Sequence, residues 1–313
     1  MMDYSLYYRN KTDLNGDWPT WDLFISAYNL SDRVSAVFNK ADANNKYWLI
    51  YPEYKFDEDE LPTNATKITA VEGNEAQQLA SIIDGIKLYD YVDKRICIDS
   101  TGFMRPQLLF IMLLLQKKSF KHVDIIYSEP DRYINKENTT FSNGAIYETR
   151  TIIGFDGTKK IDNDRALLII AAGYDTKLIS KIAQYNENTD IIHLIGFPSL
   201  RADMFQENII KAISSADSST ENVLAKPIFS PAADPFETAR DIENYISING
   251  CIEKYGHIYL CPLSTKAQTI GMGLAYLNTY SQSNVSIIYP FTDSYSKGTS
   301  VGISNLWIYT LEF

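Results

Sequence analysis

Two short segments of the chain carry the same pattern, a cysteine followed three residues later by a Ser-Thr pair. Residues 97–101 read C-I-D-S-T, and residues 261–265 read C-P-L-S-T. Each pattern ends a short apolar run and precedes a stretch with helical spacing. Hydroxyl side chains at the start of a helix can bind an anion together with the unpaired N–H groups there. They also cap helices for structural reasons alone, so both interpretations stay open.

Charged and small residues beside these hydroxyls favour an anion. Arg105 can form a two-pronged contact with phosphate, and Gly102 permits close backbone approach. Lys266 begins a helix, where the helix dipole disfavours a cation unless an anion lies beside it. A third turn again has a lysine at a helix start. The residues predicted to bind an anionic, nucleotide-like ligand are Ser100, Thr101, Gly102, Arg105, Asp175, Thr176, Lys177, Ser264, Thr265 and Lys266.

Two acidic residues are candidates for catalysis. Asp99 ends an apolar strand directly before Ser100, where a carboxylate could bind a ribose hydroxyl, hold a metal or cap a helix. Its counterpart in the second pattern is Leu263, so a carboxylate role belongs to one copy only. Glu129 also follows a strand end, although charges at such positions are more often solvated. With Asp99 or Glu129 as catalytic residue, the alternative function is a nucleotide hydrolase or glycosyl-type transferase.

Composition excludes several classes of protein. The 313 residues carry a formal charge of −10, whereas a general nucleic-acid binder usually has a basic surface. The three cysteines and three histidines lack metal-ligand spacing, so we expect no metal, no cofactor and a reducing compartment. No apolar run is long enough to span a membrane, and the N-terminus lacks a secretory signal. These features predict a cytoplasmic protein.

Apolar strands alternate with helical patterns along the chain. Strands are expected at residues 21–28, 47–51, 95–98, 123–127, 166–172, 191–195, 257–261 and 285–289, with one or two more within 301–313. Helices are expected at residues 31–40, 75–86, 104–116, 177–184, 236–255 and 266–277. This alternation predicts an α/β fold with a doubly wound, mostly parallel, Rossmann-like sheet. The hydroxyl-bearing turns then lie at the carboxyl edge, where such sheets bind ligands.

The similarity of the two patterns extends further along the chain. Each is followed by a helix, a V-x-I-I-Y strand (123–127 and 285–289) and a later tyrosine. We interpret this as a duplication that gives two pseudo-symmetric halves, 1–150 and 151–313, which can also pack as one continuous domain. The polar stretch 133–164 is expected to be irregular and to form a boundary or excursion, and 214–222 is a second such stretch.

The run from Leu108 to Leu115 is apolar on all sides of its helix. A helix of this kind must be covered on every side. Either the other half of the chain or another molecule provides that cover. We therefore expect a homodimer, or a partner subunit, at Leu108–Leu115.

Two segments resemble known families. The segment C-P-L-S-T-K-A-Q-T-I-G-M-G-L-A-Y resembles the late ligand loop of CRISPR-associated Rossmann-fold (CARF) domains, with Leu263 and Ser264 in place of that family's glycines. The resemblance implies a dimeric sensor that binds signalling oligonucleotides through Thr265 and Lys266. The segment W-D-L-F-I-S-A-Y-N-L-S-D-R resembles the opening of TIR-type domains, some of which cleave NAD, but their catalytic glutamate has no counterpart here.

The sequence therefore predicts a cytoplasmic sensor or binding protein for a nucleotide-like anion, in prokaryotic signalling or defence. The alternatives are the nucleotide-processing enzyme described above and a partner-binding subunit without a ligand.

Overall fold

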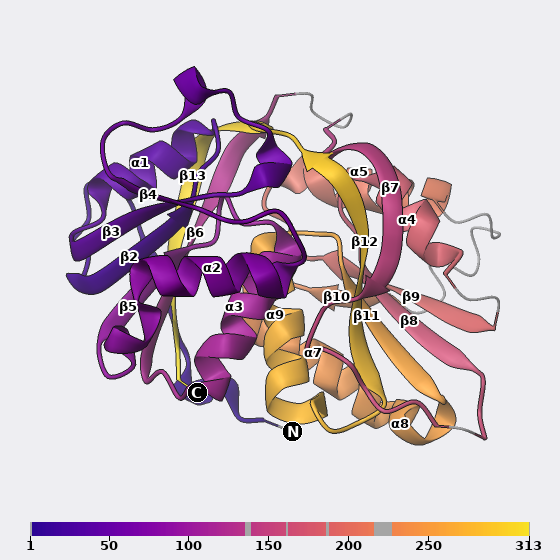
Figure 1. The fold of residues 1–313 in the computed structure, drawn as a ribbon. Helices are drawn as coiled ribbons and strands as arrows, with labels where there is room; N and C mark the ends of the chain where they lie inside the picture. Colours follow the sequence, from indigo (N-terminus) through magenta and orange to yellow (C-terminus); the bar gives the residue numbers. More distant parts are fainter. Residues whose placement is uncertain (1, 135–138, 161, 186–187, 216–226, 313) are drawn as a thin grey trace. The chain divides into compact units, whose positions relative to one another are not determined.

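The computed structural model describes residues 2–134, 139–160, 162–185, 188–215 and 227–312. By contact, the chain divides into two compact units (Figure 1). The first unit comprises Ser5–Asn143 and Ser294–Phe313, and the second comprises Met1–Tyr4 and Gly144–Asp293. The predicted division into 1–150 and 151–313 stays a prediction. Most of the predicted excursion at 214–222 lies outside the described residues.

The first unit contains a seven-stranded sheet in the order β1-β13-β6-β5-β2-β3-β4. Its five parallel strands are β2 (Trp21–Ala27), β3 (Ala43–Ile50), β4 (Thr66–Thr69), β5 (Arg95–Asp99) and β6 (His122–Tyr133). Strand β13 (Ser300–Leu311) is antiparallel to β6, and β1 (Tyr8–Thr12) is antiparallel to β13. The main helices of this unit are α1 (Asp32–Lys40), α2 (Glu75–Ile86) and α3 (Arg105–Lys117). Short 3-10 helices are η1 (Tyr4–Leu6), η2 (Pro52–Tyr54), η3 (Glu58–Glu60) and η4 (Leu88–Tyr91).

The second unit contains a six-stranded sheet in the order β10-β9-β8-β11-β12-β7. Its parallel strands are β8 (Ala166–Ala171), β9 (Thr189–Gly196), β10 (Ile228–Ser230), β11 (His257–Pro262) and β12 (Val285–Tyr295). Strand β7 (Ser142–Thr151) forms the edge beside β12. The helices are α4 (Thr176–Ala183), α5 (Ala202–Ser215), α7 (Pro235–Ile248), α8 (Cys251–Lys254) and α9 (Lys266–Ala275), which leads into the π-helix η6 (Tyr276–Tyr280). The predicted α/β fold with mostly parallel, Rossmann-like sheets is confirmed.

The two sheets share one strand order. When the parallel strands of each unit are numbered along the chain, both sheets read 3-2-1-4-5. The order therefore reverses between β2 and β5 in the first unit and between β8 and β11 in the second. Ligands bind at such switch points in open α/β sheets. In both units the C-x-x-S-T pattern ends the fourth parallel strand, which agrees with the predicted pseudo-symmetric halves.

The strand register limits how far the repeat extends. Val123 pairs with Ile96, one residue before Cys97, whereas Val285 pairs with Ile258, three residues before Cys261. The two V-x-I-I-Y strands are therefore displaced by two residues relative to the cysteines. The shorter connection between Thr265 and Val285 accounts for this displacement, so the similar letters do not occupy equivalent positions.

Several element boundaries differ from the predictions. Strand β7 occupies part of the stretch 133–164, which was wrongly expected to be irregular. Most of its residues are exposed or half-buried, so it lacks the apolar signature of the buried strands. The predicted helix 236–255 is divided into α7 and α8, because Gly250 has a left-handed φ of 57°.

In both units, the strand that comes directly after the fifth parallel strand joins the sheet of the other unit. Strand β6 belongs to the first unit, and the next strand, β7, joins the sheet of the second. Strand β12 begins in the second unit, and the next strand, β13, joins the sheet of the first. Besides a crossing at Tyr4–Ser5, the chain passes between the units at Asn143–Gly144 and again at Asp293–Ser294. The connections are therefore reciprocal.

The apolar helix α3 is covered within a single chain. Its buried side chains include Leu108, Leu109, Ile111, Met112, Leu113 and Leu115. This removes the reason for placing a second subunit against it, and the homodimer stays a prediction. None of the described helices combines the length and the apolar character that crossing a membrane requires.

Candidate functional site

A buried polar pair occupies the switch point of the first unit. Ser26, near the end of β2, is the register partner of Asp99 at the end of β5. The Asp99 side chain is fully buried; its Oδ2 accepts a hydrogen bond from Ser26 Oγ at 2.9 Å, and its Oδ1 accepts one from the Thr101 backbone N–H at 3.0 Å. Burial raises the pKa of Asp99, and the bonds from Thr101 and Ser26 and the charge of Arg33 act in the opposite direction. Asp99 thus fixes the turn that carries Thr101.

Arg33 is a buried cation beside this turn. It is the second residue of α1 and is only 9% exposed. Its Nη1 donates to the backbone oxygen of Ser128, and its Nη2 donates to Ser300 Oγ at 2.7 Å. Its Nε is buried without a hydrogen-bond partner, and no carboxylate among the described residues forms an ion pair with it. The Asp99 carboxylate acts on Arg33 only through its charge and does not bond it. A buried guanidinium without a bonded carboxylate is costly, and a bound anion would offset that cost.

More hydroxyl groups and a second arginine lie near Arg33. The hydroxyls of Thr101 and Ser128 are hydrogen-bonded at 2.8 Å. Arg105 is the first residue of α3, is 7% exposed and lies over the Phe141 ring at 5.6 Å from its centroid. Burial raises the pKa of Tyr127 and of Tyr133, and the charges of Arg33 and Arg105 both counteract that rise. Both guanidinium groups therefore act on the same two tyrosines.

Other predicted site residues are held by the protein itself. The backbone N–H and hydroxyl of Ser100 both donate to the backbone oxygen of Ile126. A Cβ on Gly102 would lie 1.8 Å from the backbone oxygen of Ala27, so the glycine is required by the chain's own packing. The Glu129 carboxylate is buried and accepts hydrogen bonds from Asn305 Nδ2 at 2.7 Å and from the indole of Trp307, both on β13.

The second unit provides an internal comparison. In register, Ile25 pairs with Ile98 in the first unit, and Ala171 pairs with Pro262 in the second. One step further along, Ser26 and Asp99 correspond to Ala172 and Leu263, which are both buried and apolar. The second residue of α4, at the helix position of Arg33, is Lys177, and its side chain is exposed. The same strand order therefore forms without these buried polar groups, so the fold alone does not require them in the first unit.

The hydroxyl and carboxylate at the second switch point cap helices. Thr265 Oγ1 accepts a hydrogen bond from the Gln268 N–H at 3.1 Å and donates to the backbone oxygen of Ala232 at 2.6 Å. Asp175 Oδ1 accepts one from the Leu178 N–H at 3.4 Å. These bonds are those expected of helix caps.

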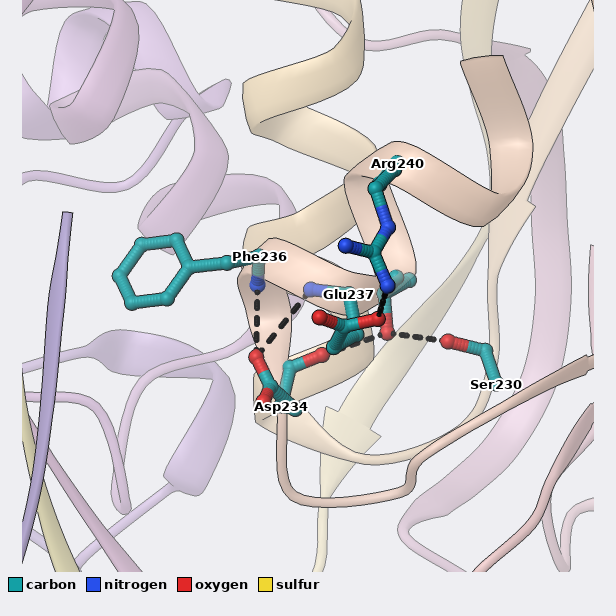
Figure 2. A network of polar contacts seen from close by, with 6 residues as sticks. Ser230, Asp234, Phe236, Glu237 and Arg240 are labelled. Carbon is teal, nitrogen blue, oxygen red and sulfur yellow. Dashed lines mark hydrogen bonds and ion pairs between the residues drawn. The ribbon is translucent and has the colours of Figure 1, made fainter. Parts of the chain in front are cut away.

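A network nearby in the second unit is satisfied internally (Figure 2). Asp234 caps α7, accepting from the Glu237 N–H at 3.2 Å. Ser230 at the end of β10 donates to Thr238 Oγ1 at 3.0 Å, and Arg240 pairs with the Glu237 carboxylate one helical turn away. Arg240 thus has the acidic partner that Arg33 lacks among the described residues.

Replacing Thr265 with alanine is expected to destabilise the second unit by about 1 to 2 kcal/mol, because both hydroxyl bonds are lost. Circular dichroism during urea unfolding measures the change. Ser281→Ala, which removes an exposed hydroxyl from the same unit, should change little. Equal stability of the two variants would contradict a capping role for Thr265.

Sequence reasoning missed Arg33, Ser26, Ser128 and Ser300. A signal for Arg33 was present, because it is a cation in the first turn of a helix that follows a buried strand, as is Lys266. Ser26 also interrupts an otherwise apolar strand end. The lack of a carboxylate bonded to Arg33 within the described residues, however, is a property of the folded chain only.

Within the described ranges, no three His, Cys, Asp or Glu side chains are grouped so that they could hold a metal ion. The fold and the site together describe an α/β protein with two Rossmann-like sheets and a cationic, hydroxyl-rich switch point in the first unit.

Comparison with models of protein families and with curated protein sequences finds no match for this chain.

Proposed function

We propose that the protein is a sensor or binding protein for a small, anionic, nucleotide-like ligand. The ligand's phosphate binds at the carboxyl edge of the first unit's sheet, close to Arg33, Arg105 and the hydroxyl of Thr101. The observation that carries the proposal is the burial of the Arg33 guanidinium, with an unpaired Nε and no bonded carboxylate among the described residues. Phosphate oxygens accept the forked hydrogen bonds that a guanidinium donates.

The internal comparison supports the same conclusion. A buried polar group usually destabilises a fold unless its hydrogen bonds are satisfied. The second unit builds the equivalent switch point with Ala172 and Leu263, so the fold does not require the Ser26–Asp99 pair, which in the first unit fixes the turn that carries the Thr101 hydroxyl.

The resemblance of residues 261–276 to CARF domains favours the same class of ligand. Under this proposal the second switch point, with Ser264, Thr265 and Lys266, is either a second site or a structural remnant of one. The Asp175-Thr176-Lys177 turn belongs to that site. We place the protein in the cytoplasm, consistent with its three cysteines, which are buried and form no disulfide.

The enzyme alternative has no specific support. Each oxygen of Asp99 accepts a hydrogen bond from Ser26 or Thr101, and each oxygen of Glu129 accepts one from β13. Both carboxylates therefore serve hydrogen bonds within the protein.

The test is thermal unfolding with mononucleotides, dinucleotides, cyclic oligonucleotides and pyrophosphate. All four tryptophans, Trp18, Trp21, Trp48 and Trp307, lie in the first unit, so their fluorescence reports on that unit. A ligand at about a hundred times its dissociation constant should stabilise the unit by about 2.7 kcal/mol.

Arg33→Met should weaken binding by a factor of about 30 or more. Arg132→Met is the matched control, because it removes an exposed arginine from the same unit and should leave binding unchanged. Undiminished binding by folded Arg33→Met, or the absence of any ligand shift in the wild-type protein, would overturn the proposal.

A further inference from the structure

Three side chains form a hydrogen-bonded relay beside the proposed anion site in the first unit. Glu53 follows β3 in η2, Gln78 lies on α2, and Gln107 lies in the first turn of α3. Gln78 Nε2 donates to Glu53 Oε1 at 2.6 Å, and Gln107 Nε2 donates to Gln78 Oε1 at 2.9 Å. Gln78 is fully buried, and Gln107 is 8% exposed.

The carboxylate sets the direction of the whole relay. An ionised carboxylate can only accept hydrogen bonds, so Gln78 must present its amide nitrogen to Glu53. Its amide oxygen then faces Gln107, which must in turn present its own nitrogen. The amide oxygen of Gln107 is consequently left at the far end.

Both ends of the relay are acceptors without a donor. Glu53 Oε2 and Gln107 Oε1 are buried and have no hydrogen-bond partner among the described residues. Buried polar atoms are nearly always paired in folded proteins, and an unpaired acceptor destabilises the fold. Each of these atoms would be satisfied by a hydrogen-bond donor brought by an occupant.

The charges nearby select the chemistry of that occupant. Burial raises the pKa of Glu53, and the neighbouring charge of Glu75 raises it further, so an added anion would be repelled here. A cation is disfavoured as well, because Gln107 shares the first turn of α3 with Arg105 and with the positive end of the helix dipole. Neutral hydroxyl groups fit both conditions.

We propose that the Glu53–Gln78–Gln107 relay binds the sugar hydroxyls of the ligand, which makes the ligand a ribonucleotide-type molecule. This inference rests on the proposed function, because the phosphate of the same molecule lies at Arg33 and Arg105. The relay and the phosphate site adjoin through the first turn of α3, which carries both Arg105 and Gln107.

Access to the relay requires a local shift. The two unpaired oxygens are covered by protein atoms. Tyr54, directly after Glu53, ties this segment to the switch point, because its hydroxyl donates to the backbone oxygen of Gly102 at 2.7 Å. Glu60, later in the same connection, pairs with Lys297 and accepts from the Tyr28 hydroxyl through its backbone oxygen. Opening this connection would admit the sugar.

The test measures the affinity of the full chain for pairs of ribonucleotides and their 2′-deoxy forms, with pyrophosphate as a sugar-free anion. We expect the wild-type protein to prefer the ribonucleotide by at least about 10-fold, the usual effect of leaving a buried polar group unpaired. Glu53→Gln replaces one acceptor oxygen with a donor, and Gln107→Met removes the other. Both should reduce the preference to less than about 3-fold and leave pyrophosphate binding unchanged.

The control is Glu72→Gln, which changes the charge of the same unit at an exposed position and should keep the preference. Equal binding of both sugars by the wild-type protein, or a preference that survives in both relay variants, would overturn the sugar site while the anion site stands. If Arg33→Met loses pyrophosphate binding and both relay variants keep it, the anion site and the sugar site act separately.

If neither pyrophosphate nor any nucleotide binds the wild-type protein, the proposed function fails. Thermal unfolding with D-ribose alone then tests whether the relay binds a sugar. A shift that is lost in Gln107→Met would support a sugar site without an anion. No shift would overturn the relay as well.

Discussion

Replacing Asp99 with asparagine is expected to stabilise the first unit at neutral pH. Asparagine has nearly the same shape, its oxygen can still accept from the Thr101 N–H, and its amide can donate to Ser26 Oγ. The substitution therefore keeps the turn and removes a fully buried charge. A buried carboxylate without a bonded cation destabilises the folded state once it is ionised.

The direction of the pH dependence follows from the raised pKa of Asp99 in the folded protein. The folded state binds the proton more tightly than the unfolded state does, so the contribution of Asp99 to stability is fully present below the unfolded pKa of about 3.9. It is lost as the pH rises through the folded pKa, and above that it stays constant. The loss amounts to about 1.4 kcal/mol for each unit of difference between the two pKa values. The Asp99→Asn variant does not have this loss, because an amide does not titrate in this range.

Urea unfolding followed by tryptophan fluorescence, between about pH 3 and pH 8, measures the effect. The advantage of Asp99→Asn over the wild-type protein should grow with pH and then level off. Asp93 is an instructive control, because its exposed carboxylate pairs with Lys121, which lowers its pKa. Asp93→Asn should show a small difference of opposite sign. Identical pH profiles for Asp99→Asn and the wild-type protein would contradict the buried-charge interpretation.

Replacing Gly102 with alanine is expected to destabilise the first unit by about 3 kcal/mol or more. The added Cβ would lie 1.8 Å from the backbone oxygen of Ala27 and 2.8 Å from its carbonyl carbon. Both atoms belong to the backbone at the end of β2, so no side-chain rotation relieves the overlap. The turn after β5 and the end of β2 must therefore separate, which disturbs Ser26 and Thr101 at the same time.

Gly298→Ala is the matched control for this substitution. Gly298 belongs to the same unit, and a Cβ there would meet Leu30 atoms no closer than 3.6 Å, an ordinary contact. Tryptophan fluorescence during urea unfolding compares the two variants under identical conditions. We expect Gly298→Ala to stay close to the wild-type midpoint. A similar midpoint for Gly102→Ala would show that this approach of the two backbones is not required.

Periodicity predicted the strands and helices that are apolar and buried. Strand β8 and helix α3 lie close to their predicted ranges, because continuous burial produces continuous apolar sequence. Strands β1 and β7 were not predicted, because both have mostly exposed or half-buried side chains and lie on sheet edges. Their position depends on pairing with strands far away in the sequence, which no local pattern encodes.

The candidate site was predictable only in part. The sequence located the turn that carries Thr101 and the arginine at the start of α3, because strand ends and helix starts leave local signals. It could not distinguish Arg33 from Lys177, since both are cations in the second position of a helix. One is buried without an acidic partner among the described residues and the other is exposed, and this difference depends on the strands packed around each helix.

The reciprocal strand connections affect how the protein can be made. Strand β13 lies between β1 and β6 in the sheet, although it follows the whole of the second unit in the sequence. Until residues 300–311 leave the exit tunnel, β1 has no neighbour and one side of β6 stays unpaired. A nascent chain that stops early therefore exposes an open sheet edge, which favours aggregation. The sheet of the first unit therefore cannot be completed until the second unit and then residues 300–311 have been synthesised.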